Sequence, residues 1–251
     1  MLKSINLISM LLILSSQMCF GCKDEAAPVT DTIINGQRVI LFSGYQWVVD
    51  SSTDKKKGPG PNYFSDSNEN VWLDKDGKLH LRITQRNGIW YCAKVTMLKS
   101  YSYGRYVFKV DSRVDYFDKN VVGGLFTYKN DLEEIDIEFS KWSVDGNMDS
   151  QFAIQPSNKS ENKRRFFLNL TAEKSTHCFN WQHDRIEFAS YRGHSSELPA
   201  VNNIIQQWIY TGADIPPDTD ERAKINLWLF RGTPPSDLKE IEMIIADFSI
   251  Q

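Results

Sequence analysis

Three acidic side chains alternate with apolar ones between Glu134 and Phe139, in the order Glu-Ile-Asp-Ile-Glu-Phe. Side chains alternate between the two faces of a β-strand, so Glu134, Asp136 and Glu138 would share one face while the apolar residues enter a core. Two carboxyl groups on a rigid surface can act as nucleophile and proton donor in the cleavage of a glycosidic bond. The simpler interpretation is a half-exposed strand with an acidic outer face. We favour a catalytic role for these acids because Glu and Asp are poor strand formers and neighbouring like charges repel.

The segments around this motif form a wider pattern. They are Asp76–Arg82, Cys92–Ala93, Tyr103–Tyr106, Leu125–Tyr128, Glu134–Phe139, His177–Trp181 and Asn226–Trp228. With these segments the chain resembles the family 16 glycoside hydrolases, endo-acting enzymes on β-linked glucans and galactans, from roughly residue 40 to the C-terminus. The acidic motif has no bulge residue before its last Glu, which is similar to the licheninase and xyloglucan-transferase branch.

The resemblance implies that Glu134 is the nucleophile, Glu138 the acid/base and Asp136 the residue that tunes them. The chemistry is consistent with these roles, because the nucleophile must be ionised, the acid must keep its proton, and close carboxyls cannot all ionise together. On a flat strand the Cα atoms of residues i and i+4 lie about 13 Å apart, whereas the carboxyls of a retaining enzyme lie about 5–5.5 Å apart. We therefore expect this strand to be concave toward the substrate.

Four residues are candidates for contact with sugars. By the resemblance, Trp228 matches a sugar-stacking tryptophan and Phe126 an aromatic on the sugar-facing strand. Trp142 has the strand parity of the three acids and would cap one end of the groove, and Gln155 lies on the following strand. For Phe126 and Trp142 the alternative is ordinary packing against the core.

The chain departs from the licheninase pattern at the residues that grip neighbouring sugars. Lys94 and Thr96 replace a Glu and an Arg, Leu132 replaces a Trp, and Ala153 and Gln155 replace an Asn and a Tyr. Specificity for mixed-linkage glucan is therefore not expected to transfer. A different β-glycan, or weak activity, follows more naturally.

The expected function is that of a retaining, endo-acting β-glycan hydrolase that works by double displacement. One alternative is a glycan-binding surface lipoprotein with weak or no catalysis, and another is a transglycosylase that uses the same residues. The basic cluster Lys163–Arg165 is most simply a solvated loop, with contact to a sulfated or uronic glycan as the alternative.

Composition limits the expected partners and cofactors. The net charge of −3 gives no reason to expect a nucleic-acid partner. The resemblance implies a polysaccharide as the partner, and we expect the protein to be a monomer. The four histidines are scattered and no His-Glu-x-x-His pattern occurs, which argues against a histidine metal site. No cofactor is expected for the reaction. The resemblance allows a structural Ca²⁺, with Asp247 as its single carboxylate ligand.

The N-terminus has the pattern of a targeting segment. Lys3 precedes the apolar run Ile5–Leu14, which is too short to span a bilayer, and Gly21-Cys22 resembles a bacterial lipoprotein cleavage site. We predict a signal peptide at 1–21, lipidation of Cys22, a tether at 22–35 and one domain at 36–251. The protein would be lipid-anchored in the bacterial cell envelope, at the outer membrane, on its periplasmic face or the cell surface. An ordinary signal peptide cut nearby is the alternative.

Many short strand-like runs separated by turn signals predict an all-β fold of two packed antiparallel sheets. The resemblance identifies it as a concanavalin A-like jelly roll with a concave substrate cleft. Only residues 200–210 show a helical pattern. Cys92 and Cys178 could form a disulfide or remain as buried free thiols.

Overall fold

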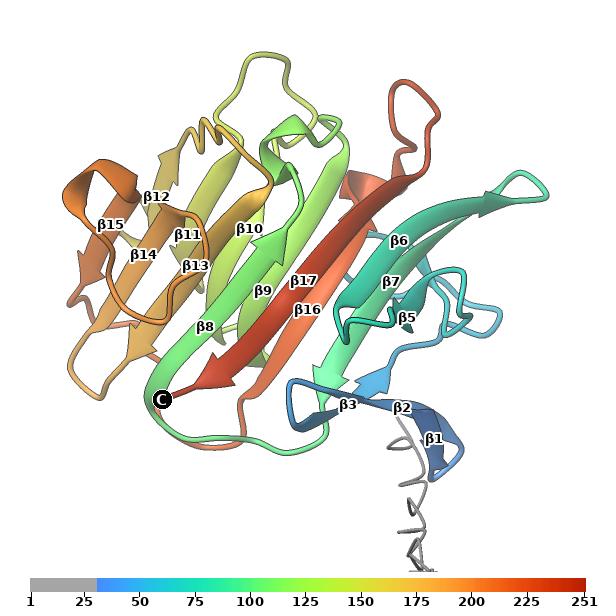
Figure 1. Cartoon of the computed structure of the whole chain (residues 1–251), viewed down its shortest axis with the longest axis horizontal. Helices are drawn as coiled ribbons and strands as arrows, with labels where there is room; N and C mark the ends of the chain where they lie inside the picture. Colours follow the sequence, from blue (N-terminus) through green and yellow to red (C-terminus); the bar gives the residue numbers. More distant parts are fainter. Residues whose placement is uncertain (1–30) are drawn as a thin grey trace, which may run out of the picture.

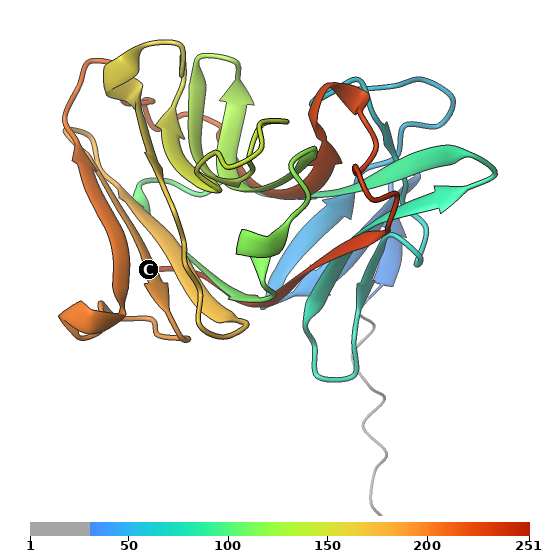
Figure 2. The same ribbon diagram turned by 90° about the horizontal axis from the view of Figure 1, so that it is seen from above.

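Two curved layers of antiparallel strands make up the fold (Figures 1 and 2). The computed structural model describes residues 31–251. The predicted all-β sandwich is confirmed, and within residues 31–251 the only helices are short 3₁₀ turns. No helix of this part of the chain is long and apolar enough to cross a membrane. The predicted signal peptide and Cys22 lie outside the described residues.

The first sheet carries the acidic motif near one end. In spatial order it consists of β1 (Asp31–Ile34), β2 (Gln37–Phe42), β3 (Tyr45–Val49), β7 (Ile89–Met97), β16 (Arg222–Leu229), β9 (Val121–Asn130), β10 (Glu133–Phe139), β11 (Ser150–Ile154) and β12 (Lys163–Phe166). All of these pairings are antiparallel. The motif on β10 lies between two neighbouring strands, β9 and β11.

The second sheet lies in front of the first in Figure 1. In spatial order it consists of β5 (Val71–Leu73), β6 (Leu79–Arg86), β17 (Ile241–Ile250), β8 (Gly104–Asp111), β13 (Lys174–Trp181), β14 (Ile186–Arg192) and β15 (Ile204–Tyr210). The end of β6 also pairs with β7, and the short β4 (Tyr63–Phe64) runs parallel to β7. The β6–β7 hairpin therefore joins the two layers.

The core between the sheets fixes which way the motif faces. Ile135, Ile137 and Phe139 are fully buried in it, and the ring of Phe139 meets the edge of His177 on β13 with 4.7 Å between ring centres. Because side chains alternate along β10, the three acids must point out of the opposite face of the first sheet. The apolar half of the motif thus positions the acidic half.

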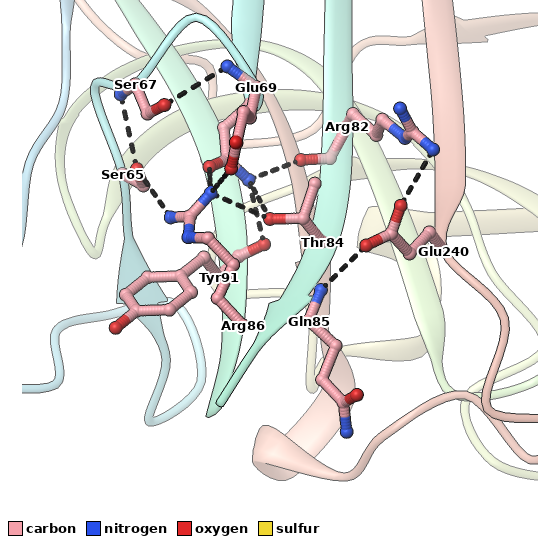
Figure 3. Close-up of polar contacts among 10 residues, drawn as sticks. Ser65, Ser67, Glu69, Arg82, Thr84, Gln85, Arg86, Tyr91 and Glu240 are labelled. Carbon is pink, nitrogen blue, oxygen red and sulfur yellow. Dashed lines mark hydrogen bonds and ion pairs between the residues drawn. The ribbon is translucent and has the colours of Figure 1, made fainter. Parts of the chain in front are cut away.

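Arg86 fastens the segment before β5 to the β6–β7 hairpin (Figure 3). Its guanidinium donates hydrogen bonds to Glu69 at 2.7 Å, Asn70 at 2.8 Å and Ser65 at 3.1 Å. It also stacks on the ring of Tyr91, 4.1 Å from the ring centre. A planar cation with several fixed donors can order a loop in this way.

Three predictions about local structure are wrong. The cluster Lys163–Arg165, expected as a solvated loop, lies in β12 and pairs with β11. Residues 31–34, assigned to the tether, form β1 and pair with β2. Residues 200–210 are not helical, because a 3₁₀ turn at Val201–Asn203 leads into β15, which takes its hydrogen bonds from β14. Pairing with a neighbouring strand overrides the weak local helical pattern here.

The two cysteines of the described chain are free thiols. Cys92 lies on β7 of the first sheet and Cys178 on β13 of the second, and both are buried. Burial raises the pKa of the Cys92 thiol to about 12, which keeps it protonated and unreactive. Of the two alternatives that the sequence left open, the structure has the free thiols.

Candidate active site

Glu134, Asp136 and Glu138 line one cleft of about 450 Å³ on the outer face of the first sheet. The pairing of β10 with β9 runs without interruption from Glu134 to Glu138, and its only irregularity falls between Glu133 and Glu134. The motif itself therefore contains no bulge, as predicted, and strict alternation keeps its three acids on one face.

Strands β7, β9 and β16, with the loop at 58–59 and the turn before β10, complete the cleft. Its other lining residues are Gly58, Pro59, Lys94, Gly124, Phe126, Tyr128, Asp131, Lys224, Asn226 and Trp228. Gly124 lies directly opposite Glu138, and a Cβ there would lie only 2.5 Å from the Asn226 Oδ1 atom. Glycine at this position therefore lets the Asn226 side chain approach the floor beside Glu138.

Two glutamines hold the acids from the β11 side. Gln151 lies opposite Glu138 and donates a hydrogen bond from Nε2 to its Oε2 at 2.7 Å. Gln155, just beyond β11, donates from Nε2 to Oδ2 of Asp136 at 3.0 Å. The Oε1 of Gln155 accepts the backbone N–H of Ser157 at 2.9 Å, which fixes the orientation of its amide. Both donors favour the ionised form of the carboxyl that they bind.

Burial works in the opposite direction on all three acids. It raises the pKa of Glu134 to about 8, and the charge of Glu138 adds to the rise. It also raises the pKa of Glu138 to about 8, with a contribution from Asp136. The pKa of Asp136 lies well above its usual range, again through burial first and the charge of Glu134 second.

When the Glu134–Asp136 pair holds a single proton, that proton belongs on Asp136. A hydrogen bond from the Asp136 carboxyl lowers the pKa of Glu134, and the nearby Lys224 ammonium lowers it further. Asp136 is nearly fully buried, so its neutral form is favoured. The site can therefore present an ionised Glu134 beside a protonated Asp136, with a proton available on Glu138.

The predicted sugar-binding residues have different positions. Trp228 and Phe126 both line the cleft. Gln155 holds Asp136 and is not among the residues that line the cleft. The strand-parity prediction for Trp142 is wrong, because β10 ends at Phe139 and the backbone of Trp142 has a φ of 54°. Its ring packs edge-on against Trp228, with 6.5 Å between ring centres, and supports that side chain.

Several of the residues that shape the site were not predicted from the sequence. Lys224 and Asn226 have the same strand parity as Trp228 and lie with it in the cleft. Applying the period-two rule backward from Trp228 along β16 would have found both. Gln151 gave no such signal, because its role depends on the cross-strand pairing of β11 with β10.

Asp247 does not have the surroundings of a calcium ligand. It lies opposite Lys109 on β8, and the Lys109 ammonium is 3.0 Å from its Oδ2 atom. Its Oδ1 accepts a hydrogen bond from Ser43 at 3.1 Å. Among residues 31–251 there is no group of three or more His, Cys, Asp or Glu side chains that could hold a metal. The lysine supplies the positive charge that a cation would bring, so the residues do not fit the Ca²⁺ that the resemblance allowed.

The fold is shared with solved glucanase structures. The β-glucanase of Bacillus licheniformis superposes with a TM-score of 0.60 at 17% identity, over 82% of this chain and 91% of that chain. A lichenase from a mouse hindgut metagenome gives 0.57 at 17%, over 82% and 92%. The Mycobacterium tuberculosis protein described as a pseudo beta-1,3-glucanase gives 0.59 at 17%, over 80% and 88%. No protein-family model matches the chain, and no curated protein matches its sequence. At these identities the similarity establishes the fold.

Proposed function

We propose that this protein is a retaining β-glycan hydrolase of the family 16 glycoside hydrolase type, which cleaves internal bonds of its polysaccharide substrate. The observation that carries the proposal is the single-face arrangement of Glu134, Asp136 and Glu138 in one cleft, with raised pKa values. The shared fold with glucanases supports the substrate class.

The residues divide the reaction between them. The ionised Glu134 attacks the anomeric carbon as Glu138 gives its proton to the leaving oxygen, so a glycosyl–Glu134 ester forms and the glycosidic bond breaks. Glu138, now ionised, removes a proton from water, and that water attacks the anomeric carbon to release Glu134. Asp136 acts as a positioning residue, because its hydrogen bond holds the charge on Glu134.

A panel of polymers tests the proposal. Residues 31–251 would be incubated with laminarin, lichenan, xyloglucan, agarose and porphyran, the product sizes measured, and the anomer first formed identified by NMR. We expect internal cleavage of at least one polymer with retained configuration. Inverted products would overturn the double displacement, and no cleavage of any β-glycan would overturn the hydrolase.

Glu134→Gln tests the nucleophile. This variant should lose at least about 10³-fold in kcat because the covalent step is removed, while it still binds oligosaccharide in a calorimetric titration. Glu173→Gln, the same chemical change at an exposed position just before β13 of the other sheet, is the control. Parental activity in Glu134→Gln would show that the nucleophile has been assigned wrongly.

A glycan-binding protein with little catalysis is the second candidate. It is favoured by the replacement of sugar-gripping residues at Lys94, Leu132 and Ala153, and a protein of the same fold is described as a pseudo-glucanase. Binding to the panel without products would support it. Longer products than the starting chains, formed in the presence of acceptor oligosaccharides, would instead indicate a transglycosylase.

We also propose that Cys22 carries a lipid that anchors the protein in the cell envelope. The apolar run at 5–14 and the small residue before Cys22 support this placement. Cys22→Ser in the full chain should move the protein from the membrane fraction to the soluble fraction. Unchanged fractionation would contradict the anchor.

A further inference from the structure

Two lysines flank the acidic motif on the same face of the first sheet. Asp136 pairs with Ala153 of β11, which pairs with Lys163 of β12. On the other side Asp136 pairs with Phe126 of β9, which pairs with Lys224 of β16. Directly paired residues point to the same face, so a row across the sheet has a lysine two strands away on each side of Asp136.

Lys224 lies in the cleft without an acidic partner. Its Nζ lies 3.8 Å from the centre of the Tyr128 ring. Within residues 31–251 no carboxylate lies within ion-pair distance of that Nζ atom, and it donates no hydrogen bond to another residue there. Burial first and the charge of Lys94 second lower its pKa to about 8, against the opposing charges of Asp50 and Glu134, neither of which is in direct contact with it. A cation that is desolvated and unpaired costs free energy unless a ligand supplies the missing charge.

Two further cations extend the charge on this face. Lys94 lines the cleft opposite Asn226, and its Nζ is 3.5 Å from Asp50. Lys163 is near enough to Glu138 for its charge to lower the pKa of that acid. Of the basic cluster at 163–165, Arg165 is occupied by the backbone carbonyls of Ser140 and Met148.

We propose that the cleft binds a β-glycan that carries anionic groups, either uronate carboxylates or sulfate esters, and that Lys224 is the residue that selects them. A neutral glycan would cover the Lys224 ammonium and leave it unpaired. An acidic sugar beside the cleavage point pairs with it, and Lys163 is placed to meet an acidic sugar on the other side. This inference rests on the proposed hydrolase function, because its first test measures rates of cleavage. A binding measurement tests it independently of cleavage.

Lys224 also acts on Glu134, so its two roles must be separated. Loss of the effect on Glu134 would reduce the rate with every substrate, whereas loss of recognition reduces the rate with acidic substrates only. The quantity to measure is therefore the ratio of kcat/KM between an acidic polymer and its neutral counterpart. The matched pairs are porphyran with agarose for sulfate, and laminarin oxidised at C6 with laminarin for carboxylate.

We expect the ratio to favour the acidic member of one pair and to fall about tenfold or more in Lys224→Gln, the size of a lost charge-assisted hydrogen bond. Lys75→Gln, at an exposed turn position, is the control and should leave the ratio unchanged. The preference should also weaken as salt is added. Which pair responds identifies sulfate or carboxylate as the group selected.

Binding separates failure of this inference from failure of the proposed function. In the Glu134→Gln protein, calorimetry with oligosaccharides of the two acidic polymers should show binding that Lys224→Gln weakens. Such binding without any cleavage by the parent protein would support the recognition of anionic glycans and overturn the hydrolase. Cleavage of neutral polymers, with neither cleavage nor binding of acidic ones, would support the hydrolase and overturn the inference. An equal fall in rate on both members of each pair would overturn the selective role of Lys224.

Discussion

Gln151 and Glu138 are cross-strand partners whose side chains share a 2.7 Å hydrogen bond. The amide donates, so it stabilises the ionised form of Glu138 and limits the rise that burial causes, which leaves the pKa of Glu138 at about 8. Glu138 must carry a proton at the start of the proposed reaction, and its pKa of about 8 lets it keep that proton at neutral pH and still release it during the reaction.

Gln151→Leu should move the alkaline limb of the kcat/KM profile to higher pH. Without the amide, the pKa of Glu138 rises, by about one unit for a hydrogen bond to a charged group. The profile of the parent protein should have its optimum near pH 8, since both Glu134 and Glu138 titrate there. Gln85→Leu, at an exposed site on β6, should leave the profile unchanged. An alkaline limb that stays in place in Gln151→Leu would contradict this role.

Glu134→Gln should make the protein more stable at neutral and alkaline pH. The folded pKa of Glu134 is about 8 against an ordinary 4.5. Between these values the unfolded chain has lost the proton and the folded chain keeps it, so stability falls as pH rises through this window. Glutamine removes that loss, which amounts to about 1.4 kcal/mol for each pH unit of the window. The difference in Tm between variant and parent should be near zero at pH 4 and grow toward pH 8.

Glu133→Gln is the control for this experiment, because the pKa of Glu133 is shifted in the opposite direction to that of Glu134. Hydrogen bonds from Asn130 and Lys129 hold the pKa of Glu133 below its usual value. Its ionised form therefore contributes stability above the ordinary carboxyl range, which is lost as pH falls. Glu133→Gln should not raise Tm at pH 8. A Tm of Glu134→Gln that follows the parent at every pH would mean that the Glu134 carboxyl is not destabilised in the fold.

The orientation of the acidic motif could be predicted from the sequence because it depends on one local rule. The acids alternate with Ile135, Ile137 and Phe139. Because these apolar side chains must be buried, the orientation of β10 is fixed, and the acids point to the other face. The same rule predicted Trp142 wrongly, because nothing local showed that the strand would end at Phe139 and the chain turn. Period two holds only as far as the strand continues.

What lies across the strands could not be predicted from the sequence alone. The period-two rule gives the face of Lys224, but only the pairing of β9 with β16 brings it beside the motif. Gln151 reaches Glu138 only through the pairing of β10 with β11. No pattern within a single strand fixes these registers. The helix expected at 200–210 was wrong for the same reason, since β15 takes its hydrogen bonds from β14. Pairing with another strand decided all three cases.

Ile137→Ala should destabilise the fold and with it the site. Ile137 is fully buried between the two sheets, directly between Asp136 and Glu138 in the chain. Truncation of such a side chain costs about 2–5 kcal/mol, through lost burial and the cavity left behind. Chemical denaturation should show this loss in the midpoint. Leu132→Ala, whose side chain is exposed in the turn before β10, should change the midpoint little. Equal midpoints for the two variants would contradict the burial of Ile137.

Removal of divalent metal should leave the stability of the described domain unchanged. The Lys109 ammonium lies 3.0 Å from Asp247 and already neutralises that carboxylate, where a calcium ion would otherwise do so. A bound ion would stabilise the folded state by mass action and raise Tm as its concentration rises. Thermal melts in excess EDTA and in added CaCl₂ should therefore coincide. A Tm that falls in EDTA and returns with CaCl₂ would contradict the ammonium's role. The same melts on Asp247→Asn would then decide whether Asp247 is the ligand, since a response that survives this change must come from a metal held elsewhere.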